Sequence, residues 1–155
     1  MIETRDLRKT FGPIRAVDGV TLSVARGEVL GFLGPNGAGK STTMKMFTFF
    51  LRPTAGTASV CGHDVIDDTL AAQRAIGYLP EGAPAYPDMT PDSFLKFVAS
   101  VRGLNGKDAK AAIERAADLV HLEGVMRQPI ETLSKGYTRR VGLAQAILHD
   151  PEVLI

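Results

Sequence analysis

The sequence predicts an α/β protein in which an N-terminal antiparallel sheet is followed by a parallel core sheet and a helical insert. Three observations support this fold class. Apolar runs suited to strands fill the N-terminal part of the chain, and a glycine-rich turn separates one of these runs from a helical segment. From Thr90 onward, apolar side chains recur at helical spacing.

Strands are expected ahead of the glycine-rich turn. The segments Ile2–Leu7 and Ile14–Ala25 carry β-branched and alternating apolar residues, and Gly12-Pro13 between them is typical of a turn. We therefore expect an antiparallel pair. Glu28–Leu33 is a short apolar run that predicts a buried strand.

The glycine-rich turn fits the pattern G-x-x-x-x-G-K-[ST]. Its glycines allow backbone N–H groups to converge on phosphate oxygens, because no Cβ atom stands in the way. The next segment, Ser41–Leu51, predicts a helix whose N-terminus adds partial positive charge. Lys40 can reach the β- and γ-phosphates, and the Ser41 hydroxyl can bind the Mg²⁺ between them. The sequence therefore predicts a nucleoside triphosphate site, whose loop residues are Gly34, Pro35, Asn36, Gly37, Ala38, Gly39, Lys40 and Ser41.

Short elements are predicted after this helix. Thr57–Cys61 is strand-like, and Asp67–Ala75 is typical of a short helix. Ile76–Leu79 predicts a second buried strand, which Pro80 ends. Glu81–Asp88 is rich in glycine and proline, so we expect a surface connection there.

The C-terminal half is expected to be mainly helical. Thr90-Pro91 is a start signal for a helix, and Ser134 suits the N-cap of a helix over Thr138–Leu148. The predicted apolar faces consist of Phe94, Leu95, Val98 and Val101, then Ala109, Ala112, Ile113, Ala116, Leu119 and Val120. Glu152–Ile155 predicts a further buried strand. The residues alone leave open whether Ser134 only caps its helix or also helps to bind an anion there.

Composition argues against several classes of protein. Lysine and arginine number 18 against 17 acidic residues, and a net charge of +1 does not favour nucleic acid as a partner. The single cysteine, Cys61, excludes an internal disulfide and fits a reducing compartment. The longest apolar run, Met46–Leu51, is too short to span a bilayer, and the N-terminus lacks a signal-peptide pattern, so we expect a cytoplasmic location. Phe11 could stack on a purine or simply pack beside the turn.

The order of these parts resembles the N-terminal two-thirds of an ATP-binding cassette (ABC) transporter nucleotide-binding domain. Gly34–Ser41 stands at the Walker A motif, and Thr42 at the adjoining phosphate-contacting position. By the same resemblance, Phe11 would stack on adenine and Val17 would lie under the same ring. The family signature Leu-Ser-Gly-Gly-Gln corresponds here to Leu133, Ser134, Lys135, Gly136 and Tyr137.

The resemblance implies a P-loop NTPase cassette with ATP and Mg²⁺ as cofactors. Its implied partners are transmembrane transporter subunits and a second nucleotide-binding domain, with the protein at the cytoplasmic face of the membrane. In such a pair, Ser134 and Gly136 of one domain would face the γ-phosphate held by Lys40 of the other.

The resemblance also implies a division of the chain into three segments. Residues 1–80 would form the β-subdomain and P-loop core, and residues 81–132 the connecting loop and helical subdomain. Residues 133–155 would form the signature helix and the start of the Walker B strand.

The chain departs from the family pattern at several positions. Glu81 replaces a glutamine that contacts Mg²⁺, and a carboxylate can also bind this metal. Lys135 and Tyr137 replace a glycine and a glutamine of the signature; Lys135 could place positive charge near a γ-phosphate or simply point to water. Phe49 stands where a glycine is usual.

The strand at 152–155 would continue in this family into the Walker B aspartate and the catalytic glutamate. We therefore expect a fragment that lacks the C-terminal part of the core, contains no catalytic residue and binds nucleotide without hydrolysing it. The alternative is a soluble ABC-type ATPase acting on DNA or ribosomes. Residues 81–132 contain no heptads and no basic stripe, which favours the transporter.

Overall fold

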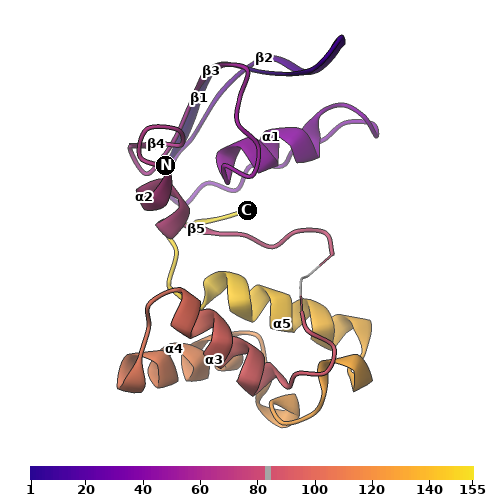
Figure 1. The fold of residues 1–155 in the computed structure, drawn as a ribbon, viewed down its shortest axis with the longest axis vertical. Coiled ribbons are helices and arrows are strands. Elements are labelled where there is room, and N and C mark those ends of the chain that lie inside the picture. Colours follow the sequence, from indigo (N-terminus) through magenta and orange to yellow (C-terminus); the bar gives the residue numbers. More distant parts are fainter. Residues whose placement is uncertain (83–84) are drawn as a thin grey trace. The chain divides into compact units, whose positions relative to one another are not determined.

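The computed structural model describes residues 1–82 and 85–155, so the predicted surface connection at 81–88 lies partly outside the described residues. The chain divides into two compact units, one of Met1–Ile76 with Ile155 and one of Gly77–Leu154. The first unit contains the N-terminal sheet, and the second contains the longer helices (Figure 1). The three segments expected from the sequence stay a prediction.

A four-stranded antiparallel sheet organises the first unit, in the order β2-β1-β3-β4. Its strands are β1 (Ile2–Phe11), β2 (Ile14–Val24), β3 (Ala55–Val60) and β4 (His63–Asp64). The predicted antiparallel pair is confirmed, and β3 adds to the other edge of β1. Where the β1–β2 register shifts after Thr4, the buried Thr4 hydroxyl donates to Val20 O and accepts from Leu22 N, so this buried polar group has hydrogen-bond partners.

Helix α1 (Lys40–Phe47) packs against β2 and β3, and the short α2 (Thr69–Arg74) packs against β4 (Figure 1). α1 ends before the predicted Leu51. Phe49 has φ +54°, and Leu51 N donates to Lys45 O at 3.0 Å, which closes the helix end. A left-handed residue after a helix is ordinarily glycine, so this conformation explains why Phe49 is unusual at its position.

The predicted buried strand at 28–33 is wrong. These residues form no strand, and Val29 and Leu33 are 97% and 95% exposed. An apolar run becomes a strand only where at least one neighbouring strand supplies hydrogen-bond partners. Among the described residues, neither sheet includes residues 28–33.

A second sheet consists of β5 (Ile76–Gly77) and β6 (Val153–Leu154), both shorter than predicted. Leu154 is 54% exposed, so the burial expected for the last strand is wrong at that residue. The combination of an antiparallel sheet, short core strands and helices confirms the predicted α/β class.

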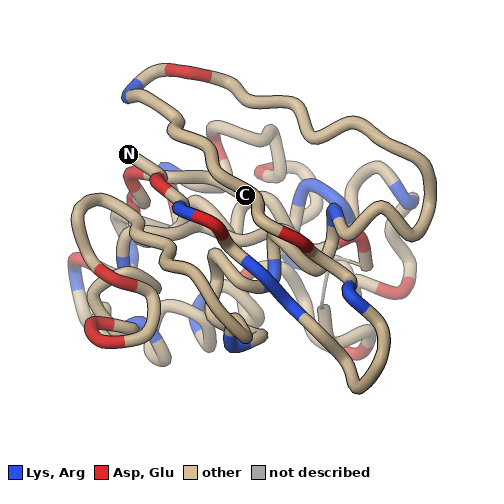
Figure 2. The backbone as a smooth tube through the Cα atoms, turned by 90° about the horizontal axis from the view of Figure 1, so that it is seen from above, with Lys and Arg blue, Asp and Glu red and all other residues tan. Residues whose placement is uncertain are grey.

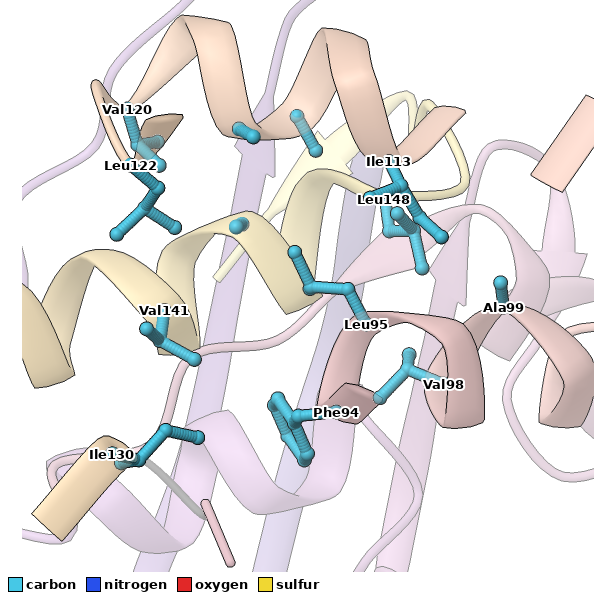
Figure 3. Packing of buried hydrophobic residues seen from close by; sticks show 13 residues of the cluster. Phe94, Leu95, Val98, Ala99, Ile113, Val120, Leu122, Ile130, Val141 and Leu148 are labelled. Carbon is cyan, nitrogen blue, oxygen red and sulfur yellow. The ribbon is translucent and has the colours of Figure 1, made fainter. Parts of the chain in front are cut away.

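The second unit packs α3 (Pro91–Val101), α4 (Gly106–Leu119) and α5 (Lys135–Ile147) around one apolar cluster, with the short 3₁₀ turns η1 (Glu123–Val125) and η2 (Ile130–Thr132) between α4 and α5. Figure 3 shows how side chains from these elements meet, among them Leu95, Leu122, Ile130, Val141 and Leu148. None of the helices within residues 1–82 and 85–155 is both long and apolar enough to cross a membrane.

The predicted helical faces are right except at their ends. Phe94, Leu95 and Val98 are buried as expected. Val101 and Leu119 are 69% and 60% exposed, and each is the last residue of its helix. Helical spacing assigns a residue to a face, but it does not show where the neighbouring element stops covering that face.

Candidate nucleotide-binding site

The glycine-rich loop before α1 forms an exposed turn in the first unit. Ala38 N donates to Pro35 O at 3.2 Å, and residues 33–38 are exposed. Gly37 and Gly39 both have φ +86°, a conformation that L side chains rarely adopt. The loop therefore presents its backbone to solvent ahead of a helix N-terminus, which is the arrangement that binds phosphate groups.

Gly39 joins the loop to the sheet. It is the N-cap residue of α1, and a Cβ atom at this position would overlap Ala16 O and approach Val17 Cγ2 to 3.2 Å. Only a residue without a side chain fits both the backbone angle and the space. This close approach holds the start of α1 against β2.

The Lys40 side chain turns back over the loop. Its Nζ donates to Gly34 O at 2.6 Å and to Pro35 O at 2.8 Å. An ammonium group has three protons, so one remains for a further acceptor. The contact places a positive charge at the loop, where the β- and γ-phosphates of a nucleotide are expected.

The residues after Lys40 provide hydroxyl groups in different surroundings. Ser41 is exposed, Thr42 is half-buried, and Thr43 is buried with its hydroxyl donating to Gly39 O at 2.9 Å. Mg²⁺ prefers oxygen ligands and keeps several waters and phosphate oxygens when it binds a nucleotide. One exposed serine hydroxyl at a helix start without acidic residues in its first turn fits this donor set.

The two residues assigned to the base are placed differently. Phe11 ends β1 and is 47% exposed, so its ring is accessible to a base. Val17 lies near Gly39 and is only 5% exposed, so little of its surface is left for a base to contact. Their roles toward adenine stay predictions.

The signature residues lie at the start of α5 in the second unit. Ser134 is the N-cap residue, and its hydroxyl accepts from Tyr137 N at 3.4 Å, which confirms the predicted cap. Leu133 is half-buried, whereas Ser134 through Tyr137 are exposed. The Arg140 guanidinium lies 5.2 Å from the centroid of the Tyr137 ring. The helix start is thus accessible, and its contact with a partner's nucleotide stays a prediction.

Glu81 is exposed and belongs to the second unit. Its proposed contact with Mg²⁺ stays a prediction. Sequence reasoning missed Lys9, whose Nζ lies over the Phe11 ring and donates to Arg52 O; the bond to Arg52 depends on a segment distant in the sequence.

The family described as ABC transporter matches residues 17–155 of this chain. The chain belongs to this family. The ABC transporter resemblance stated from the loop and the signature is therefore confirmed, and with it the P-loop cassette fold.

Two curated relatives show how much of each chain the similarity covers. The probable multidrug ABC transporter ATP-binding protein YbhF of Escherichia coli (strain K12) is 37% identical over 154 residues, which are 99% of this chain and 27% of the relative. The linearmycin resistance ATP-binding protein LnrL of Bacillus subtilis (strain 168) is 34% identical, over 100% of this chain and 50% of the relative. The chain thus spans between about a quarter and a half of these relatives.

A solved structure of an ATP binding subunit of an ABC transporter has a TM-score of 0.87 to this chain at 28% identity. The match covers 99% of this chain and 64% of that structure. The names of these relatives describe ATP-binding proteins, which agrees with the nucleotide site predicted from the loop.

Proposed function

We propose that this chain forms the phosphate-binding part of a nucleotide-binding domain that, in the intact protein, couples ATP binding and hydrolysis to transport across a membrane. The observation that carries the proposal is the loop before α1. Its backbone is exposed, Gly37 and Gly39 adopt left-handed angles, and Lys40 Nζ lies against the carbonyls at the start of the loop. These features bind phosphate through N–H groups and a fixed cation.

Mg²⁺ would accompany the nucleotide in this proposal. Ser41 would supply one ligand, Glu81 would supply a second contact, and phosphate oxygens and waters would complete the shell. Bound Mg²⁺ would neutralise charge that develops on the phosphates during hydrolysis. Within the chain, Lys40 would orient the β- and γ-phosphates, and Thr42 would contact a phosphate from the first turn of α1.

A second nucleotide-binding domain would complete each ATP site. The exposed start of α5 supports this part of the proposal, because the backbone N–H groups of Lys135 and Gly136 and the Ser134 hydroxyl can donate to an anion held by a partner. Lys135, also exposed, would add positive charge to the same helix start.

Transmembrane subunits would be the other partners, which would place the protein at the cytoplasmic face of the membrane. Nucleic acid is not proposed as a partner. Figure 2 shows lysine and arginine interspersed with aspartate and glutamate along the backbone, and the net charge is +1. A nucleic-acid surface would instead require clustered positive charge.

Phosphate release tests the proposed function. We expect the intact protein to release phosphate from ATP in a Mg²⁺-dependent reaction that chelation of the metal stops. Residues 1–155 produced alone should bind nucleotide but not match this rate, because hydrolysis needs a group that orients the attacking water as well as a phosphate site. Absence of Mg²⁺-dependent release by the intact protein would contradict the proposed function.

Equal rates from the intact protein and from residues 1–155 would lead to a different conclusion. The catalytic carboxylates would then have to lie within this chain, and our assignment of none would be wrong. Glu81→Gln would be the next variant to measure.

A further inference from the structure

Lys9 lies against the aromatic ring that is expected to hold the nucleotide base. Its Nζ is 5.2 Å from the centroid of the Phe11 ring, and both residues belong to β1. A cation within about 6 Å of a ring centroid is attracted by the negative face of the ring. Lys9 is half-buried, so this ammonium group is less free than an ordinary surface lysine.

The ammonium group is held by a segment that is distant in the sequence. Lys9 Nζ donates to Arg52 O at 2.7 Å, and Arg52 lies between α1 and β3. Three further hydrogen bonds join the same connection to β1: Thr54 N donates to Arg8 O at 2.9 Å, and Thr10 N and the Thr10 hydroxyl donate to Thr54 Oγ1 at 3.0 Å and 3.3 Å. Figure 1 shows this connection leaving α1 and rising to the sheet. The position of the Lys9 charge is therefore tied to the helix that follows the phosphate loop.

The Lys9 charge affects how a nucleotide base can stack on the Phe11 ring. A cation on one ring face leaves only the opposite face for a stacked base, and Phe11 remains 47% exposed. The face of an aromatic ring is negative, and two such faces repel each other when stacked directly. A cation on the far side draws electron density toward itself, which reduces this repulsion and strengthens stacking with an electron-rich base.

We propose that Lys9 is a positioning residue for the adenine base: its ammonium group, held by the Arg52 carbonyl, fixes the Phe11 ring and directs its free face toward the base. This inference rests on the proposed nucleotide site, but it concerns only the base and not the phosphates. Lys9 acts through Phe11 and needs no contact with the nucleotide.

The test compares two probes in the intact protein by calorimetric titration: ATP and inorganic tripolyphosphate, which lacks the base. Lys9→Met removes the charge and keeps a long, flexible side chain. It should weaken ATP binding by at most about five-fold, the ratio reached if the free energy of an exposed cation–π contact is gained only when the base is bound, and leave tripolyphosphate binding unchanged. The matched control is Arg5→Met, which removes an equal charge from an 81% exposed side chain on the same strand and should change neither affinity.

A double-mutant cycle tests whether Lys9 acts through the ring. In a Phe11→Ala background, Lys9→Met should cause no further loss of ATP affinity, because the ring on which it acts is absent. A loss of the same size in both backgrounds would overturn the proposal. An equal loss of tripolyphosphate affinity would also overturn it, since Lys9 would then act on the phosphates.

The outcomes separate this inference from the proposed function. If Phe11→Ala weakens ATP binding but Lys9→Met does not, Lys9 has no positioning role and the nucleotide site still stands. If neither Lys40→Ala nor Phe11→Ala changes binding of either probe, the nucleotide site itself is wrong, and the inference is wrong with it.

Discussion

Lys40→Ala should weaken ATP binding by about 100-fold, since a hydrogen bond to a charged group contributes about 1.5–3 kcal/mol and each 1.4 kcal/mol is tenfold in affinity. The side chain already lies at the loop, with Nζ 2.6 Å from Gly34 O and 2.8 Å from Pro35 O. The Gly34 and Pro35 carbonyl oxygens carry only partial negative charge, whereas bound phosphates carry full negative charge. Nζ should therefore interact more strongly with the nucleotide than with these carbonyl oxygens. Calorimetric titration of the intact protein with Mg²⁺ and ATP measures the change.

Lys45→Ala is the matched control for this experiment. Lys45 is an exposed lysine in the last turn of the same helix, and its substitution removes the same charge without touching the loop. We expect its ATP affinity to stay within about twofold of the unchanged protein, because isolated surface charges are screened over about 10 Å in salt. Equal affinities for Lys40→Ala and the unchanged protein would show that the loop does not bind the phosphates.

Gly39→Ala should disrupt both the loop and its attachment to the sheet. A left-handed angle costs a residue with a side chain about 1–2 kcal/mol, and forcing atoms into a packed site costs about 1–3 kcal/mol more. Gly39 incurs both costs, because its φ is +86° and a Cβ would overlap Ala16 O. We expect a loss of about 2–5 kcal/mol in the free energy of unfolding, measured by denaturant titration, together with loss of ATP binding.

Gly37→Ala separates these two costs. Gly37 has the same φ of +86°, but a Cβ there would meet nothing within 4 Å. Its substitution should therefore lower the free energy of unfolding only by the cost of the left-handed backbone angle, about 1–2 kcal/mol. Equal losses of unfolding free energy in Gly37→Ala and Gly39→Ala would contradict the packing of Gly39 against β2. No loss of unfolding free energy in either variant would contradict the left-handed conformation of the loop.

Local patterns predicted local structure well. Thr90-Pro91 and Ser134 mark the starts of α3 and α5 because a cap depends on residues a few positions away, and both side chains accept the expected backbone hydrogen bond. The antiparallel pair of β1 and β2 followed from alternating residues around one turn. The phosphate loop was found for the same reason, since its glycines and lysine are close together in the sequence.

Features that depend on distant residues could not be predicted from local patterns. Residues 28–33 have the composition of a buried strand, but pairing partners decide whether a strand forms. Val101 and Leu119 fit their helical faces, yet they are 69% and 60% exposed. The link from Lys9 to Arg52 joins residues on different elements, and no spacing rule connects them.

A crystal structure of the intact protein with Mg²⁺ and a non-hydrolysable ATP analogue tests the central claim most directly. The account predicts that the phosphates lie on the backbone N–H groups of residues 37–42, with Lys40 Nζ in contact with the β- and γ-phosphates and the Ser41 hydroxyl at the metal. Phosphates bound elsewhere, or a Lys40 side chain that keeps its bonds to Gly34 O and Pro35 O and makes no phosphate contact, would contradict it.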